Sequence, residues 1–124
     1  MGLCQLEINR QRLPMKARFT PKYIFYSVLG HEFPAGVEEY KFHPTRKWKF
    51  DYAVPEFKIA FEYEGGVYSK GQGHLSATVY SKNCEKYNAA ALLGWSVYRF
   101  TNPMIGIASE FYDVIDAIKK GREV

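Results

Sequence analysis

The fold is decided by residues 48–66, which read WKFDYAVPEFKIAFEYEGG. Two segments of this stretch, 48–54 and 58–64, are rich in aromatic and β-branched residues, and a short gap that begins with Pro55 separates them. Residues of these kinds favour β-strands, and a short gap with a proline is typical of a tight connection between neighbouring strands. The stretch therefore predicts a hairpin of two antiparallel strands.

The segments on either side of the hairpin complete an α/β domain with a mixed four-stranded sheet. We expect further strands over 37–42 and 95–100, and helices over 21–29, 77–93 and 103–120. Gly30 and Gly94 follow the first two helices, where glycine commonly ends a helix. The order is α-β-β-β-α-β-α, and the helix before the last strand allows that strand to return parallel to one of the others.

The second and third helices carry apolar residues at helical spacing, which predicts one buried face for each. The face expected to be buried on the helix over 77–93 consists of Tyr80, Cys84, Tyr87 and Ala91. The inner face expected on the last helix consists of Ile107, Phe111, Val114, Ile115 and Ile118.

The composition fits one soluble domain with one core. The chain has 124 residues, of which 47% are hydrophobic, and residues 1–18 have the pattern of an irregular basic arm. There is no signal-peptide pattern, and Cys4 and Cys84 suggest neither a disulfide framework nor a zinc site. We therefore expect a cytoplasmic protein, and its net charge of +4 favours a polyanionic partner.

The alternation of side chains along the hairpin predicts a face that carries acids. Residues two apart in a strand share a face of the sheet. One face of the hairpin is apolar and consists of Trp48, Phe50, Tyr52, Ile59, Phe61 and Tyr63. The other carries Asp51, Glu62 and Glu64 among Ala53 and Ala60. This face is either the wet side of a half-buried sheet or a site, and its small alanines favour a site.

The register of the hairpin brings two of these acids together. A turn centred on Glu56 or Phe57 sets Asp51 opposite Glu62, and such cross-strand partners lie ~5 Å apart, where like charges repel. A hard divalent cation would relieve this repulsion. Magnesium is the simplest candidate, because proteins hold it with one or two carboxylates plus phosphate oxygens.

The strand over 37–42 adds further charged side chains to this face. With Tyr40 and Phe42 directed to the core, Glu39 falls opposite Asp51 and is a candidate fourth acid. Lys41 and Lys49, on the same face, are candidate phosphate contacts. The alternative is that these charged residues simply form a solvent-exposed surface of the strand, with no binding role.

The stretches RKWKFDYAVPEFKIAFEYEGG (46–66) and EKYNAAALLGWSVYRFTNPMI (85–105) resemble the PD-(D/E)XK nuclease superfamily. The similarity spans about 39–105 and is strongest to very-short-patch-repair-like endonucleases and to the small bacteriophage and archaeal-type Holliday junction resolvases. It implies a restriction-endonuclease-like core and metal-dependent hydrolysis of phosphodiester bonds in DNA, with Mg²⁺ as cofactor and Mn²⁺ as its substitute.

The resemblance also implies roles for individual residues. Asp51 and Glu62 match the acids that hold the metal. Glu64 stands where many members carry the catalytic lysine, and we expect it to be a third ligand of one or two magnesium ions. Lys86 or Lys82, from the following helix, could supply that charge, and we favour Lys86. Archaeal-type resolvases carry a glutamate in the first helix, which the helix over 21–29 lacks. The candidates to replace it are Glu39, which we rank first, Glu32 and Glu7.

The basic residues predict how DNA is held. The candidates for contacts to its backbone are Arg46, Lys47, Lys49, Lys70, His74 and Lys82. Such contacts position DNA without reading its sequence, and no segment is left over for a recognition module. We therefore expect structure-selective cleavage of branched DNA by a twofold homodimer, as in a Holliday junction resolvase. The alternatives are a monomeric nicking endonuclease for mismatches or branches, and a non-catalytic DNA-binding module.

Overall fold

The structure of the protein is a computed structural model, and it describes residues 20–65, 76–106 and 110–122. The predicted basic arm over 1–18, Lys70, His74 and Ile107 lie outside the described residues. Among the residues that are described, no helix combines the length and apolar character needed to cross a membrane.

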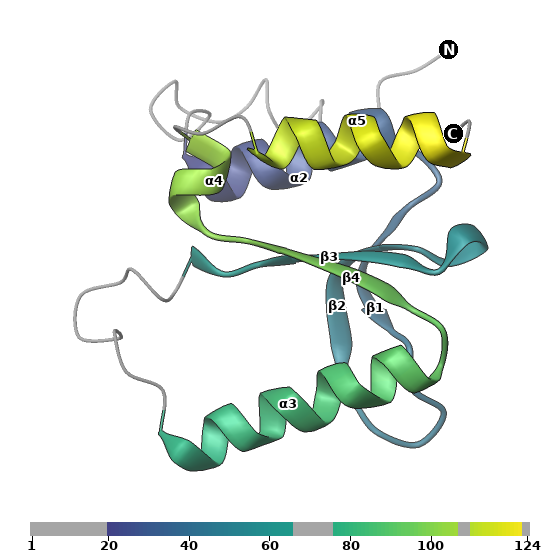
Figure 1. The fold of residues 1–124 in the computed structure, drawn as a ribbon, viewed down its shortest axis with the longest axis vertical. Helices are drawn as coiled ribbons and strands as arrows, with labels where there is room; N and C mark the ends of the chain where they lie inside the picture. Colours follow the sequence, from purple (N-terminus) through teal and green to yellow (C-terminus); the bar gives the residue numbers. More distant parts are fainter. Residues whose placement is uncertain (1–19, 66–75, 107–109, 123–124) are drawn as a thin grey trace.

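The described residues form an α/β arrangement in which a four-stranded sheet lies between two layers of helices. The elements in chain order are α2 (Pro21–Glu32), β1 (Val37–Lys41), β2 (Lys49–Val54), the 3₁₀ helix η2 (Pro55–Phe57), β3 (Ile59–Tyr63), α3 (Ala77–Leu92), β4 (Ser96–Phe100), α4 (Asn102–Gly106) and α5 (Glu110–Arg122). Helix α3 covers one side of the sheet, and α2, α4 and α5 cover the other (Figure 1).

The sheet has the order β1-β2-β3-β4. Strands β1, β2 and β3 form an antiparallel meander, and β4 runs parallel to β3 after the α3 crossover. The predicted mixed sheet and the predicted parallel return of the last strand are therefore confirmed.

The predicted bounds of the first and last helices are wrong, whereas those of α3 are confirmed. Helix α2 continues through Gly30, which is buried, and reaches its C-cap at Phe33, because tertiary burial overrides the weak helix propensity of glycine. The segment expected to be one helix over 103–120 contains α4 and α5, and α4 ends at Gly106. After α3, Gly94 has a φ of +88°, which glycine adopts without strain.

Two apolar clusters hold the layers together. The larger lies between the sheet and helices α2, α4 and α5, and its buried members include Phe25, Leu29, Tyr52, Phe61, Phe111, Ile115 and Ile118. The smaller lies on the α3 side and consists of Phe50, Ala53, Ala60 and Ala90, with Tyr40, Phe42 and Trp95 packed against it. The inner face predicted for the last helix is thus confirmed at Phe111, Ile115 and Ile118.

The predicted alternation along β2 is wrong at its first half. Phe50 packs in the cluster under α3, whereas Tyr52, two residues later, packs in the larger cluster. The strands are distorted at this level, since Glu39 of β1 has a φ of +53° opposite Asp51. Figure 1 shows β1 and β2 bending away from β3 and β4 toward α3. Tyr40 and Phe42 therefore serve the smaller cluster rather than the main core.

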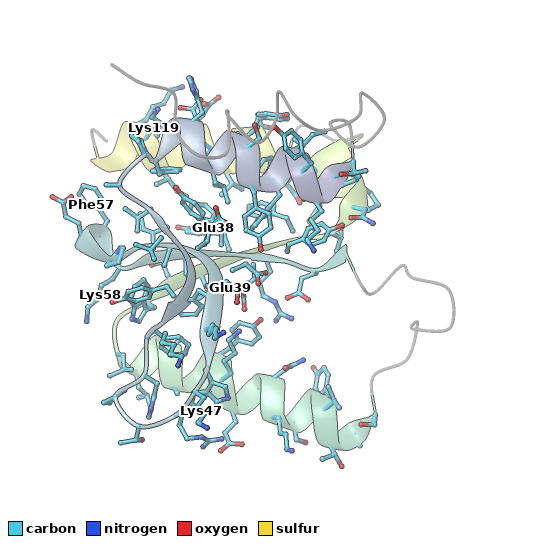
Figure 2. The ribbon with its side chains drawn as sticks, turned by 180° about the vertical axis from the view of Figure 1, so that it is seen from behind. Glu38, Glu39, Lys47, Phe57, Lys58 and Lys119 are labelled. Carbon is cyan, nitrogen blue, oxygen red and sulfur yellow. The ribbon has the colours of Figure 1, made fainter. Side chains whose placement is uncertain are left out.

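The buried face predicted for α3 is wrong at Tyr80, Cys84 and Ala91, whereas Tyr87 does turn toward the sheet. Tyr80 is 62% exposed, Cys84 and Ala91 are exposed, and Ala90 is the fully buried residue of the helix. Helix α3 contacts the small side chains of the sheet through its C-terminal half, which lies beside the β1–β2 hairpin in both views (Figures 1 and 2). The face that turns inward there also brings Lys86 and Tyr87 to the sheet.

Candidate active site

Asp51 and Glu62 face each other across β2 and β3, as the register predicted. Tyr52 pairs with Phe61, so the next pair toward the open end of the hairpin is Asp51 with Glu62. The backbone amide of Asp51 donates to Oε2 of Glu62 over 2.9 Å, and the amide of Tyr63 donates to Oδ2 of Asp51 over 2.7 Å. The two carboxylates thus bind amides at the point where β2 and β3 separate.

Burial raises the free-energy cost of placing two negative charges at this pair of acids. Glu62 is only 4% exposed and Asp51 is partly buried. Burial, followed by the neighbouring charge of Glu62, raises the pKa of Asp51 to about 7, although the amide of Tyr63 acts in the opposite direction. Without further positive charge beside it, Asp51 is therefore only partly ionised at neutral pH.

Lys86 of α3 supplies a positive charge to this pair. Its Nζ lies 2.5 Å from Oε1 of Glu62, and its side chain is only 16% exposed. The structure thus places Lys86 at the carboxylates, and its catalytic role stays a prediction. Lys82, the alternative on the same helix, is exposed.

Glu64 extends the site along β3 toward β4. Its Oε1 accepts from Nε of Arg99 over 2.8 Å and from the hydroxyl of Tyr87 over 3.4 Å. The same hydroxyl donates to Oε1 of Glu62 over 3.0 Å, and the Arg99 guanidinium lies 4.2 Å from the centre of the Tyr87 ring. Burial and then the charges of Glu62 and Glu64 raise the pKa of Tyr87, so it stays a hydroxyl donor.

Sequence reasoning missed Tyr87, Arg99 and Tyr26 as site residues. Arg99 reaches the site because β4 pairs with β3 and sets it opposite Glu62. The sequence predicted that the last strand is parallel to another strand, but not that its partner is β3. Tyr26 of α2 lies close enough to the acids for their charges to affect it. Burial raises its pKa most, and the charges of Asp51 and Glu39 raise it further. No local pattern in 21–29 indicates that orientation.

Glu39 stands opposite Asp51 in the register of β1 and β2, as predicted. Figure 2 shows Glu38 and Glu39 as neighbours on β1, over the middle of the sheet. The carboxylate of Glu39 is 62% exposed and lies 3.8 Å from Nζ of Lys49. Its proposed part in holding metal stays a prediction.

Of the predicted DNA contacts that are described, Arg46 and Lys47 lie in the β1–β2 loop, Lys49 begins β2 and Lys82 lies on α3. Arg46 pairs with Glu85 of α3 at 2.9 Å and lies 4.0 Å from the centre of the Trp48 ring, while Lys47, Lys49 and Lys82 are exposed. Nδ1 of His43 accepts from the amide of Arg46 over 2.9 Å, so this histidine shapes the β1–β2 loop. The ion pair ties that loop to the helix that carries Lys86.

The carboxylates of one pair of acids, Asp51 and Glu62, are suitable ligands for magnesium. Within 20–65, 76–106 and 110–122, no three Asp, Glu, His or Cys side chains gather as a metal-binding group, and Glu62 and Glu64 are bound to Lys86, Tyr87 and Arg99. Asp51 and Glu62 still offer two facing carboxylates, which is the number that magnesium commonly takes from a protein. A cation between them would offset the burial and the repulsion from Glu62 that raise the pKa of Asp51.

Comparisons of the chain with protein-family models, with curated proteins and with solved structures found no match. The function proposed for this protein rests on the chemistry of its own residues.

The raised pKa of Asp51 predicts how the metal-free protein responds to pH. An acid whose pKa is higher in the folded than in the unfolded state binds its proton more tightly when folded. Stability is therefore lost as the pH rises from the ordinary value of 3.8 toward the folded value of about 7. Asp51→Asn removes this titration, so in EDTA its melting temperature should exceed that of wild type by more at pH 8 than at pH 5. Melting curves that shift in parallel over this range would contradict the electrostatic account of the pair.

Proposed function

We propose that this protein is a magnesium-dependent DNA endonuclease of the PD-(D/E)XK type that cuts branched DNA, as a Holliday junction resolvase does. The observation that supports this best is the facing pair Asp51 and Glu62, with the Lys86 ammonium on Glu62. Two acids from adjacent strands can hold a metal that assists hydrolysis of a phosphodiester, and a nearby lysine can stabilise the negative charge that develops.

The order of the elements supports the same proposal. The run α2, β1, β2, β3, α3, β4, with β4 parallel to β3, agrees with the α-β-β-β-α-β core that the resemblance to the superfamily implies. The bend of β2 away from β3 leaves the acids at the open end of the hairpin, where a DNA backbone could approach.

The residues of the site have separate tasks in this reading. Asp51 and Glu62 would hold Mg²⁺, which, when bound, polarises the scissile phosphate and lowers the pKa of the attacking water. Lys86 neutralises Glu62 before the metal binds. With Glu62 bound to a metal, the Lys86 ammonium would be free to donate to the phosphate or to the attacking water.

The surface near the site favours contacts to DNA phosphates. Lys47 and Lys49 are exposed on and beside the β1–β2 loop, and Lys82 is exposed on α3. Phosphate contacts carry no sequence information, so discrimination would come from the shape of the DNA. A twofold dimer would set two such surfaces at a fixed angle and place the two cuts symmetrically.

The proposal predicts selective binding and symmetric cleavage of four-way junctions. At moderate salt a junction should bind much more tightly than a duplex of equal length, and both affinities should fall as salt rises because both depend on phosphate contacts. Gel filtration with mapping of the cuts on a labelled junction tests this. A monomer that nicks one strand of a mismatched duplex would contradict the resolvase proposal and favour the nicking endonuclease.

A further inference from the structure

We propose that Arg99 binds a phosphate of the DNA strand in the site, and that Glu64 positions Arg99 instead of holding metal. This inference rests on the proposed function, because it assigns tasks within the same site. It gives Glu64, which stands where many superfamily members have a lysine, a task unlike that of Asp51 and Glu62.

The planar guanidinium of Arg99 is hydrogen-bonded along one edge and packed against an aromatic ring on one face. Its Nε donates to Oε1 of Glu64 over 2.8 Å, and its guanidinium lies 4.2 Å from the centre of the Tyr87 ring. Strand pairing fixes its base, since Arg99 is the register partner of Glu62 in the parallel β3–β4 ladder. An arginine fixed in this way has already lost much of the rotational freedom that ligand binding would otherwise cost.

The anchored guanidinium still has donors to offer. Arginine carries five N–H donors in a planar fork, and the bond to Glu64 uses the one on Nε. The side chain is 48% exposed despite both anchors, so its terminal nitrogens lie at the rim of the site. A planar fork matches two oxygens of a phosphate, which is why arginine is used to recognise that group.

The contacts of Glu64 favour a positioning task over metal binding. Its Oε1 accepts from both Arg99 and Tyr87, and the Tyr87 hydroxyl also donates to Glu62. Glu62 therefore binds Lys86 next to Asp51, whereas Glu64 binds Arg99 at the rim of the site. The Tyr87 hydroxyl lies between the two glutamates. This divides the acids into a metal-holding pair, Asp51 and Glu62, and one acid that orients an arginine.

Titration of a short fluorescent duplex in EDTA, where no metal-dependent cleavage occurs, tests the task of Arg99. Arg99→Gln should bind roughly ten- to hundredfold more weakly than wild type. The slope of log K against log salt should become less steep by about 0.9, the amount expected for one lost phosphate contact. Arg99→Lys keeps the charge but not the fork, and it should recover the slope more fully than the affinity. The control Lys120→Gln, on the exposed side of α5, should match wild type.

The task of Glu64 is tested by comparing its effects on metal and on DNA. Glu64→Gln should weaken binding of the duplex while leaving the affinity for Mn²⁺, measured by calorimetry, close to that of wild type, because Glu64 is not a metal ligand in this assignment. In the Arg99→Gln background it should add little, because the two residues act as one unit. Melting curves of each variant verify that the loss of binding is not a loss of folding.

Two results would overturn this inference. One is Arg99→Gln with the affinity and salt slope of wild type, and the other is Glu64→Gln with weakened Mn²⁺ binding and full affinity for DNA. Failure of the proposed function looks different. A wild-type protein that binds DNA through Arg99 but cuts nothing would refute the endonuclease and leave the assignment of Arg99 in place.

Discussion

Replacement of Asp51 with asparagine should abolish magnesium-dependent cleavage and leave DNA binding close to that of wild type. Asparagine keeps the shape of the side chain and an oxygen that can accept from the amide of Tyr63, but it removes the charge that faces Glu62. Loss of a metal's charge stabilisation costs several kcal/mol, which corresponds to a fall in rate of roughly a thousandfold or more. Binding should survive, because the change removes a charge that repels phosphate.

Single-turnover cleavage and an anisotropy titration, performed on the same preparation, measure the two effects. Asp116→Asn is the matched control, because Asp116 is exposed on α5, on the other side of the sheet from α3. Cleavage by Asp51→Asn at the wild-type rate would show that the metal site has been assigned to the wrong residues.

Replacement of Lys86 with alanine should slow single-turnover cleavage by about two to three orders of magnitude, the range for loss of one transition-state donor. Lys86 contacts Glu62 at 2.5 Å and is mostly buried. No other lysine among the described residues is held against Asp51 or Glu62 in this way. Lys120→Ala, at an exposed position of α5 that has no part in the site, is the control and should cleave at nearly the wild-type rate.

The Lys86 variant also leaves Glu62 buried without its cation, which destabilises the fold. Melting curves in saturating Mg²⁺ therefore accompany the kinetics, because metal can replace the lost charge at Glu62. A folded Lys86→Ala protein that cleaves like wild type would transfer the role to Lys82 or Lys49, or to the metal alone.

The local features of the fold were predictable from the sequence. The strands around Pro55 and their register follow from a short connection, and this placed Asp51 opposite Glu62. The end of α3 follows from Gly94, whose backbone has a positive φ. Each of these depends on residues close together in the chain, where propensity and turn length decide the outcome.

The distortion of the sheet was not predictable in this way. Strict alternation put Phe50 and Tyr52 on one face, but the strands change direction at Asp51 and Glu39, and Phe50 packs under α3. The same packing determines which side of α3 is buried, so the predicted stripe through Tyr80 failed. Both outcomes depend on contacts between segments that are distant in sequence.

The site was predicted in part for the same reason. Asp51 and Glu62 come from one hairpin, and Lys86 follows from the resemblance of the helix that carries it. Arg99 and Tyr87 join the acids only because β4 pairs with β3 and α3 turns that tyrosine toward Glu62. Helical spacing placed Tyr87 on an inward face without indicating a contact with the acids, and no local pattern pairs Arg99 with Glu62.

The most direct test of the central claim is incubation of the wild-type protein with labelled four-way junction, fork and linear duplex, in Mg²⁺, in Mn²⁺ and in EDTA. The proposed function predicts cleavage of the branched substrates in Mg²⁺, activity in Mn²⁺ as well, and no cleavage in EDTA. Substrates that all remain intact in both metals, although the protein binds them, would contradict it and leave a DNA-binding module. Cleavage that persists in EDTA would contradict the task given to Asp51 and Glu62.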